Sequence, residues 1–319
     1  MDKKWHLAAI FKIKQLKKHF CMAKNNPMPI PASELILNPD GSIYHLNLQP
    51  EQLAHTVFLV GDPDRVPKVS RHFDRLDCQV QKREFVTHTG WIGSQRLSVI
   101  STGIGTDNID IVLNELDALV NIDLATRTVR DSLSSLQLVR IGTSGSLSPA
   151  IPVDSMLCSA YGAGMDNLMQ YYQADLSDQE RLLQQQLYDF FRPWRIPVQP
   201  FAAAADAELS GRAGKGMARG ITLTCPGFYA PQGRSLRARS VLDRSFFDAV
   251  SSFAFEGLQI TNFEMETAAI LGLARLLGHQ AASCNAILAN RITNEFSARP
   301  RQAEELLIRQ VLENVGGEK

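Results

Sequence analysis

The chain has 319 residues, 45% of them hydrophobic, so it can bury a sizeable core as one large domain or two small ones. Its 33 basic and 33 acidic side chains cancel, and a chain with no excess positive charge lacks the electrostatic footprint of a DNA- or RNA-binding protein. No apolar run reaches the roughly 18 to 20 residues of a membrane span. Lysines interrupt the apolar residues near the N-terminus, so a signal peptide is not predicted either.

Residues 1–24 form a basic segment with seven lysines and one aspartate, a net charge of +6, interleaved with apolar side chains such as Trp5 and Leu7. Such a segment could bind a membrane surface or act as a targeting signal. We favour either of two simpler interpretations, a poorly ordered tail or a stretch translated from upstream of a true start at Met22. We therefore assign residues 1–24 to a basic tail that is not necessarily native, and residues 25–319 to one domain.

The cysteines are scattered and form no C-x-x-C pair, which predicts reduced thiols in a cytoplasmic protein without structural zinc. The chain contains five: Cys21, Cys78, Cys158, Cys225 and Cys284.

Residues 25–50 are rich in Pro, Asn and Gly and predict an extended arm, after which strands and helices alternate. Short apolar runs, several followed by glycine-containing turns, predict strands at Thr56–Val60, Arg96–Ile100, Leu136–Ile141, Val153–Ser159, Ile221–Thr224 and Ala281–Leu288. Helical periodicity predicts helices at Ile109–Val120, with Asp107 as N-cap, and at 177–192, 263–277 and 300–314. This alternation indicates an α/β sheet, and the absence of repeats and linkers indicates a single domain.

The first candidate site is the string Gly61–Arg65 (GDPDR), directly after a predicted strand. Ligands of α/β proteins collect at the carboxyl ends of strands. A glycine there lets backbone N–H groups approach an anion, and Arg65 could bind it with two hydrogen bonds. The alternative is an ordinary Asp-Pro turn with Arg65 on the surface.

The second candidate is Arg140, which lies inside an apolar strand and precedes the predicted turn Gly142–Gly145 (GTSG). A buried charge is costly unless it is paired. Either a bound anion or an internal carboxylate would pair Arg140. The hydroxyl and N–H groups of the predicted turn favour the anion.

The third candidate is Glu266, which the predicted helix 263–277 places one turn inside an apolar helix. Thr261 and Glu264 fit a capping box, which gives Glu264 a structural role. Glu266 has no such role, and its carboxylate could accept hydrogen bonds from sugar hydroxyls.

The fourth candidate is Phe228–Arg234 (FYAPQGR), which offers a ring for stacking, the amide of Gln232 and the guanidinium of Arg234. These groups suit a flat heterocycle with two carbonyls and an N–H. Without other signals the segment would be an ordinary loop.

Together these strings resemble the uridine phosphorylases of the nucleoside phosphorylase family, from about Tyr44 to the last predicted helix. Also in register are Arg83–Phe85 (REF), Ser101–Gly105 (STGIG), Asn262–Thr267 (NFEMET) and Asn290-Arg291. The resemblance implies a three-layer α/β/α domain with a central mixed, twisted sheet. It also implies phosphorolysis of uridine to uracil and ribose 1-phosphate, with inorganic phosphate as co-substrate and neither metal nor organic cofactor.

Matched motif by motif, the resemblance also assigns the site residues. The phosphate-binding residues are Gly61, Arg65, Arg83, Arg140 and Thr143. The ribose-binding residues are His45, Thr143, Met265 and Glu266. The base-binding residues are Phe228, Gln232 and Arg234, with Arg291 behind them. Arg65, Arg140, Thr143 and Glu266 are expected to be catalytic. His45 and Arg83 are expected to come from a neighbouring subunit, which implies a homodimer with shared active sites, or a hexamer built from three such dimers.

Two alternatives remain, and one departure from the family pattern stands out. A purine nucleoside phosphorylase or nucleosidase would place Ser-Asp where this chain has Asn290-Arg291, and a cation cannot protonate a purine. A non-catalytic nucleoside sensor would lack ligand residues, and none is missing. Thr106–Asn108 replaces a Gly-Pro-Ser string of many bacterial members, which removes support for the interface potassium site that some build with the counterpart of Glu84.

Overall fold

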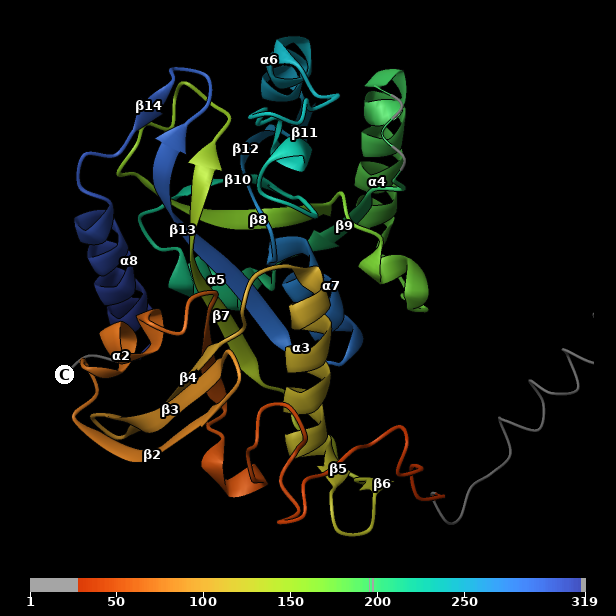
Figure 1. Cartoon of the computed structure of the whole chain (residues 1–319), viewed down its shortest axis with the longest axis vertical. Helices are drawn as coiled ribbons and strands as arrows, with labels where there is room; N and C mark the ends of the chain where they lie inside the picture. Colours follow the sequence, from red (N-terminus) through yellow and green to blue (C-terminus); the bar gives the residue numbers. More distant parts are fainter. Residues whose placement is uncertain (1–27, 195, 197, 317–319) are drawn as a thin grey trace, which may run out of the picture.

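We describe residues 28–194, 196 and 198–316 of a computed structural model, in which a large mixed sheet is covered by helices on both faces (Figure 1). The sheet order is β11-β12-β10-β8-β13-β7-β1-β4-β3-β2, with β9 beside β8 and β14 beside β13. Its strands are β1 (Thr56–Val60), β2 (Arg75–Lys82), β3 (Phe85–Ile92), β4 (Gln95–Ser101), β7 (Gln137–Ser146), β8 (Met156–Gly164), β9 (Phe201–Ala204), β10 (Ala218–Thr224), β11 (Ala254–Phe255), β12 (Leu258–Glu264), β13 (Gln280–Asn290) and β14 (Glu295–Phe296).

The helices and the smaller elements connect these strands. The α-helices are α2 (Arg65–Ser70), α3 (Thr106–Asn121), α4 (Asp178–Phe191), α5 (Ala207–Ala213), α6 (Arg244–Ser252), α7 (Thr267–Leu276) and α8 (Pro300–Val315). The short elements are the 3₁₀ helices η1 (Pro50–Gln52), η2 (Leu168–Tyr171), η3 (Arg192–Trp194) and η4 (Ala230–Gln232), and the hairpin β5 (Ile122–Asp123) with β6 (Thr128–Val129). None of the described helices is long and apolar enough to cross a membrane.

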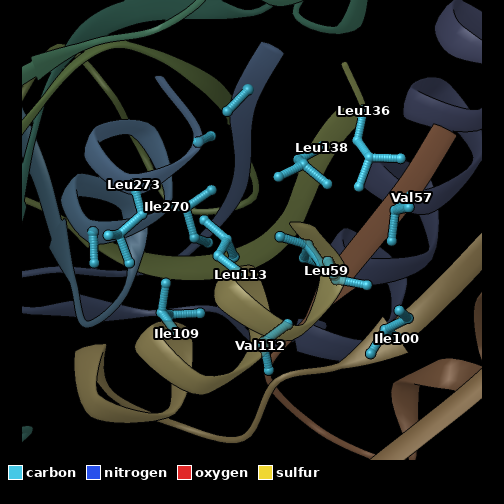
Figure 2. Packing of buried hydrophobic residues seen from close by; sticks show 14 of the residues in the cluster. Val57, Leu59, Ile100, Ile109, Val112, Leu113, Leu136, Leu138, Ile270 and Leu273 are labelled. Atoms are coloured by element: carbon cyan, nitrogen blue, oxygen red, sulfur yellow. The ribbon is translucent and has the colours of Figure 1, made fainter. Parts of the chain in front are cut away.

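Alternation of side chains along β1 divides the core into two layers. Val57 and Leu59 point to the face covered by α3 and α7, and Figure 2 shows them packed with side chains of both helices. Phe58 and Val60 point to the opposite face, which α2, α5 and α8 cover. Because successive strand residues face opposite sides, a strand such as β1, which is apolar from Val57 to Val60, must be buried on both faces. The expected three-layer α/β/α fold is confirmed.

The central strands β4, β1, β7 and β13 run parallel, so their carboxyl ends meet at one edge of the sheet. The strand β12 crosses that edge, because Asn262 and Phe263 pair antiparallel with Ser146 and Gly145 of β7. This crossing brings the residues that follow β12 to the ends of the parallel strands.

Three local expectations are wrong. Residues 142–145 are not a turn: β7 continues to Ser146 because it pairs with β13 along its length. The chain at 258–264 is the strand β12, so Thr261 does not cap a helix, and Glu266 is the N-cap residue of α7. The N-cap of α3 is Gly105, and Asp107 lies in its first turn.

Candidate active site

A cavity of about 360 Å³ opens where β1, β4, β7, β12 and β13 end. Its lining comes from these strand ends and from the segment that follows β10. The lining residues are Gly61, Asp62, Arg65, Ile104, Arg140, Thr143, Ser144, Gly145, Phe228, Gln232, Arg234, Phe263, Glu264, Met265, Glu266, Leu288, Ala289 and Phe296.

Most of the site residues expected from the sequence line this cavity. They are Gly61, Arg65, Arg140, Thr143, Phe228, Gln232, Arg234, Met265 and Glu266. Arg291, His45 and Arg83 are not among its lining residues. The sequence did not single out Asp62, Ile104, Phe263 or Phe296 as site residues: the first three lie inside the motif strings but were given no role, and Phe296 lies outside every string.

Arg65 lies at one end of the cavity, at the first position of α2 and just after the end of β1. Its side chain is buried and donates from Nη1 to the carbonyl oxygen of Ile141 at 3.3 Å, and from Nη2 to Glu304 Oε2 at 3.1 Å. The surface alternative considered for Arg65 is therefore wrong.

Arg140 is buried beside Arg65 in the cavity wall and is paired within the chain. Its Nη2 lies 2.6 Å from Glu266 Oε2 and 3.1 Å from Glu264 Oε2, and its Nη1 donates to Asn285 Oδ1 at 2.7 Å. Internal carboxylates therefore neutralise Arg140, which the sequence argument weighed but did not favour.

A glycine makes this arrangement of Arg140 possible. Gly142 lies two residues further along β7, on the same face of the strand. A Cβ atom at Gly142 would lie 1.9 Å from Arg140 Nη1. The glycine therefore leaves the space into which the guanidinium folds.

The two acidic side chains that follow β12 have different neighbours. Glu264 accepts from Thr224 Oγ1 at 2.7 Å and from the backbone N–H groups of Glu266 and Thr267, so it still caps α7 although Thr261 does not. Glu266 accepts at Oε1 from the N–H of Gly105 at 2.8 Å. Gly105 has a φ of 99°, which a residue with a side chain rarely adopts.

The buried environment shifts the pKa values of both Glu266 and Arg140. Burial raises the pKa of Glu266 above its ordinary value of 4.5, an effect that Arg140 opposes and Glu264 reinforces. Burial also disfavours the charged form of Arg140, but Glu264 and Glu266 outweigh it, so the pKa of Arg140 is raised and the arginine stays a cation. The cavity thus contains a fixed positive charge beside a carboxylate that protonates more easily than usual.

The other end of the cavity is built from η4 and its flanks. The Cζ of Arg234 lies 3.8 Å from the centre of the Phe228 ring, and its Nη1 donates to Gln232 Oε1 at 2.6 Å. The amide NH₂ of the buried Gln232 can donate to a ligand, and its Oε1 has a second lone pair that can accept one more hydrogen bond. This end therefore presents an exposed aromatic ring beside hydrogen-bond donors.

Arg291 lies behind this end, as expected. Its Nη1 donates to the carbonyl oxygen of Gln232 at 3.3 Å, and its Cζ lies 5.3 Å from the Phe247 ring and 5.8 Å from the Phe263 ring. Asn290 is fully occupied by backbone groups, donating to Ser148 and Ile151 and accepting from Ile292 and Thr293. The described acidic residues that line the cavity, Asp62, Glu264 and Glu266, make no hydrogen bond to Phe228, Gln232 or Arg234.

His45 and Arg83 lie together away from the cavity. Glu115 of α3 accepts from the backbone N–H groups of His45 and Leu46 and lies 2.6 Å from His45 Nδ1. The guanidinium of Arg83 lies 6.0 Å from the ring of Tyr44, and its backbone has a φ of 54°. Both side chains are therefore held next to the arm and outside their own cavity.

The described residues contain no group of three or more His, Cys, Asp or Glu side chains that could hold a metal ion. The four described cysteines, Cys78, Cys158, Cys225 and Cys284, are free thiols. What the cavity offers is two arginines and a glycine turn for an anion, a carboxylate for hydroxyl groups, and an aromatic, donor-rich end for a ring.

An α/β sheet with an arginine-lined cavity at the carboxyl ends of its strands is typical of enzymes that bind an anion together with a ring-bearing substrate. A model of the phosphorylase superfamily matches residues 55–314, so the chain belongs to that superfamily and is an enzyme of this class.

Curated relatives and a solved structure agree with this assignment to the phosphorylase superfamily. The chain is 28% identical to a uridine phosphorylase of Thermococcus kodakarensis over 81% of this chain and 80% of that protein. It is 25% identical to a uridine phosphorylase of Haemophilus influenzae over 85% of this chain and 96% of that protein. A Trypanosoma brucei nucleoside phosphorylase with uridine phosphorylase activity matches with a TM-score of 0.79 at 26% identity, over 88% of this chain and 99% of that one.

Proposed function

We propose that the protein is a uridine phosphorylase, a pentosyltransferase that uses inorganic phosphate to cleave uridine to uracil and ribose 1-phosphate. One observation carries the choice of base: Gln232 and Arg234 place donors beside the Phe228 ring, and none of the described acidic residues that line the cavity is hydrogen-bonded to these three residues. A purine enzyme needs an acid there to protonate the leaving base, and Asn290 and Arg291 cannot provide one.

The charges fit the course of this reaction. As phosphate attacks C1′ and the bond to N1 of uracil breaks, positive charge builds on the ribose and negative charge on the carbonyl oxygens of the base. Donors already fixed beside those oxygens stabilise the leaving group as its charge forms. Phosphate held by Arg65 and Arg140 is both the nucleophile and the counter-charge to the sugar. Gly61 and Thr143 supply further donors to it, and no metal or organic cofactor is required.

The ribose would lie between these two ends, against Met265 and Glu266. An ionised Glu266 accepts hydrogen bonds from sugar hydroxyls, and it contacts Arg140 directly. The same side chain thus links the sugar to the phosphate-binding arginine. We expect Glu266 to orient the sugar so that C1′ faces the phosphate.

We also propose a homodimer with shared active sites. Both arginines at the phosphate end already have carboxylate partners, Glu304 for Arg65 and Glu264 with Glu266 for Arg140. A phosphate dianion therefore meets little uncompensated positive charge within one chain. Arg83 of a second copy would add a cation, and His45 from the same arm would approach the sugar. Three such dimers would form a hexamer.

A uridine phosphorylase of this kind would act in pyrimidine salvage, and we place it in the cytoplasm. The decisive experiment follows absorbance for uridine, thymidine, cytidine, inosine and adenosine, with and without phosphate. We expect uracil release from uridine only with phosphate, and intact inosine. Cleavage without phosphate, or a preference for inosine, would refute the proposal, and binding without turnover would identify a sensor.

A further inference from the structure

Glu304 of α8 joins two cations of α2. Its Oε2 lies 3.1 Å from Arg65 Nη2, and its Oε1 lies 2.8 Å from Lys68 Nζ. Arg65 lines the cavity, whereas Lys68 and Glu304 do not. Glu304 thus forms an ion pair with Arg65, a residue of the cavity wall, although Glu304 itself lies outside the cavity.

The ion pair of Glu304 with Arg65 is largely buried. The side chain of Glu304 is 14% exposed and that of Arg65 is 10% exposed. Burial alone would raise the pKa of Glu304, but Arg65 and Lys68 outweigh burial and lower it, so the side chain is an anion at neutral pH. An ion pair that excludes solvent is screened less by salt than a surface pair.

The hydrogen bonds of Arg65 show which of its N–H groups remain available to a ligand while Arg65 is paired with Glu304. Nη1 donates to the carbonyl of Ile141 and Nη2 to Glu304, whereas the buried Nε has no partner among the described residues. A guanidinium carries five N–H donors in one rigid plane. Hydrogen bonds that fix some of these donors therefore also fix the directions of the remaining N–H groups.

We propose that Glu304 is a positioning residue for phosphate binding: it holds Arg65 in the orientation that presents its remaining donors to the anion. This inference rests on the proposed function, because it assigns Arg65 to phosphate. Glu304 touches no substrate and acts only through Arg65.

Two effects of removing Glu304 have opposite signs. The loss of a nearby negative charge would favour phosphate, whereas a freed arginine must lose its rotamer freedom on binding. We expect the second effect to win, because without Glu304 only the hydrogen bond to the carbonyl oxygen of Ile141 still holds the guanidinium of Arg65. Glu304→Ala should therefore weaken phosphate binding about tenfold, a loss typical of mispositioned ligand groups. Glu304→Gln, which keeps one acceptor oxygen, should weaken it less.

The test measures the dissociation constant of inorganic phosphate by calorimetry, together with KM for phosphate, KM for uridine and kcat. We expect the change in KM for phosphate, with the other two nearly constant. Glu305→Gln is the matched control, since Glu305 is the next residue and pairs with Arg71, His72 and Arg309 on the surface. It should bind phosphate like the wild type.

A double-mutant cycle decides whether Glu304 acts through Arg65. In an Arg65→Ala background, Glu304→Ala should have no further effect on phosphate affinity. An equal effect in both backgrounds, or tighter phosphate binding by either Glu304 variant, would overturn the inference. Wild-type protein that binds no phosphate would instead refute the proposed function, so the two failures are distinguishable.

Discussion

Arg140 and Glu266 share a hydrogen bond of 2.6 Å between Nη2 and Oε2, inside the wall of the cavity. The pair joins the end that we assign to phosphate with the part that we assign to ribose. Each charge is therefore both a ligand-binding group and the partner that makes the other tolerable in a buried site.

Replacing Arg140 with alanine should harm folding as well as activity. The change leaves Glu264 and Glu266 buried without their cation, which typically costs about 3 to 5 kcal/mol of unfolding free energy. We expect turnover to fall at least ~100-fold, as for loss of a fixed charge-stabilising donor. Urea unfolding and steady-state assays measure the two effects. Arg75→Ala, which removes an exposed ion pair with Asp77 and a contact with the ring of Trp91, should cost much less stability.

A double variant separates the causes of that loss. Arg140→Ala combined with Glu266→Gln removes one of the stranded charges and should recover part of the stability but none of the activity. Wild-type stability of Arg140→Ala at pH 7 would show that the ion pairs are not needed for folding.

Activity should decline in acid with the protonation of Glu266. Its pKa is raised above 4.5, so kcat/KM for uridine should fall as the pH decreases through that raised value. The contribution of this group to stability has the opposite trend: it is present below 4.5 and is lost as the pH rises through the folded-state pKa. Near-ultraviolet circular dichroism over the same range should therefore show a folded protein while activity declines.

A methyl group at Gly142 should disturb phosphate binding without touching phosphate. The Cβ of Gly142→Ala would collide with Nη1 of Arg140 and push the guanidinium from Glu266 and Asn285. We expect KM for phosphate to rise about tenfold or more, as for other small displacements of binding groups. Gly211→Ala is the control, because its Cβ meets nothing within 4 Å in α5. Equal kinetics for both variants would contradict the prediction.

Mixed oligomers should regain activity if sites are shared between subunits. Arg83→Ala and Arg65→Ala should each be nearly inactive alone. In a mixed dimer one site receives both defects and the other receives neither, so random mixing should restore about one quarter of wild-type sites. Refolding the two variants together, with mass spectrometry to confirm mixing, measures this. Mixed dimers without recovered activity would place Arg83 outside the site of its partner.

Sequence patterns predicted best where local and tertiary preferences agree. The run Thr56–Val60 was predicted with the bounds that β1 has, because burial on both faces makes four of its five residues apolar. The helix at 177–192 was also predicted, from its helical periodicity, and the structure adds a capping box of Ser177 and Glu180 at its start. The cavity residues at Gly61 and Arg65 followed from their place after a strand.

The prediction failed where tertiary pairing overrides a local signal. Residues 142–145 have the composition of a turn, yet pairing with β13 and the antiparallel pairing of Gly145 with Phe263 of β12 keep them in a strand. The hairpin β2–β3 was missed although Leu76, Cys78 and Val80 alternate with polar side chains, because most of β2 is exposed and the residues that join the two strands, Arg83 and Glu84, are not typical turn residues. The partners of Arg140 could not be chosen from sequence, because Glu264 and Glu266 are more than 120 residues away.

The helix α3 and its N-cap residue contact two of the candidate site residues, Glu266 and His45. Gly105, its N-cap, donates to Glu266, and Glu115, three turns later, holds His45. At about 1.5 Å per residue, a rod of roughly 15 Å separates these contacts. In the proposed dimer, the first contact serves the cavity of its own subunit and the second serves that of the neighbour. A distortion of this one helix would then damage two cavities at once, and a mutant subunit would impair its healthy partner.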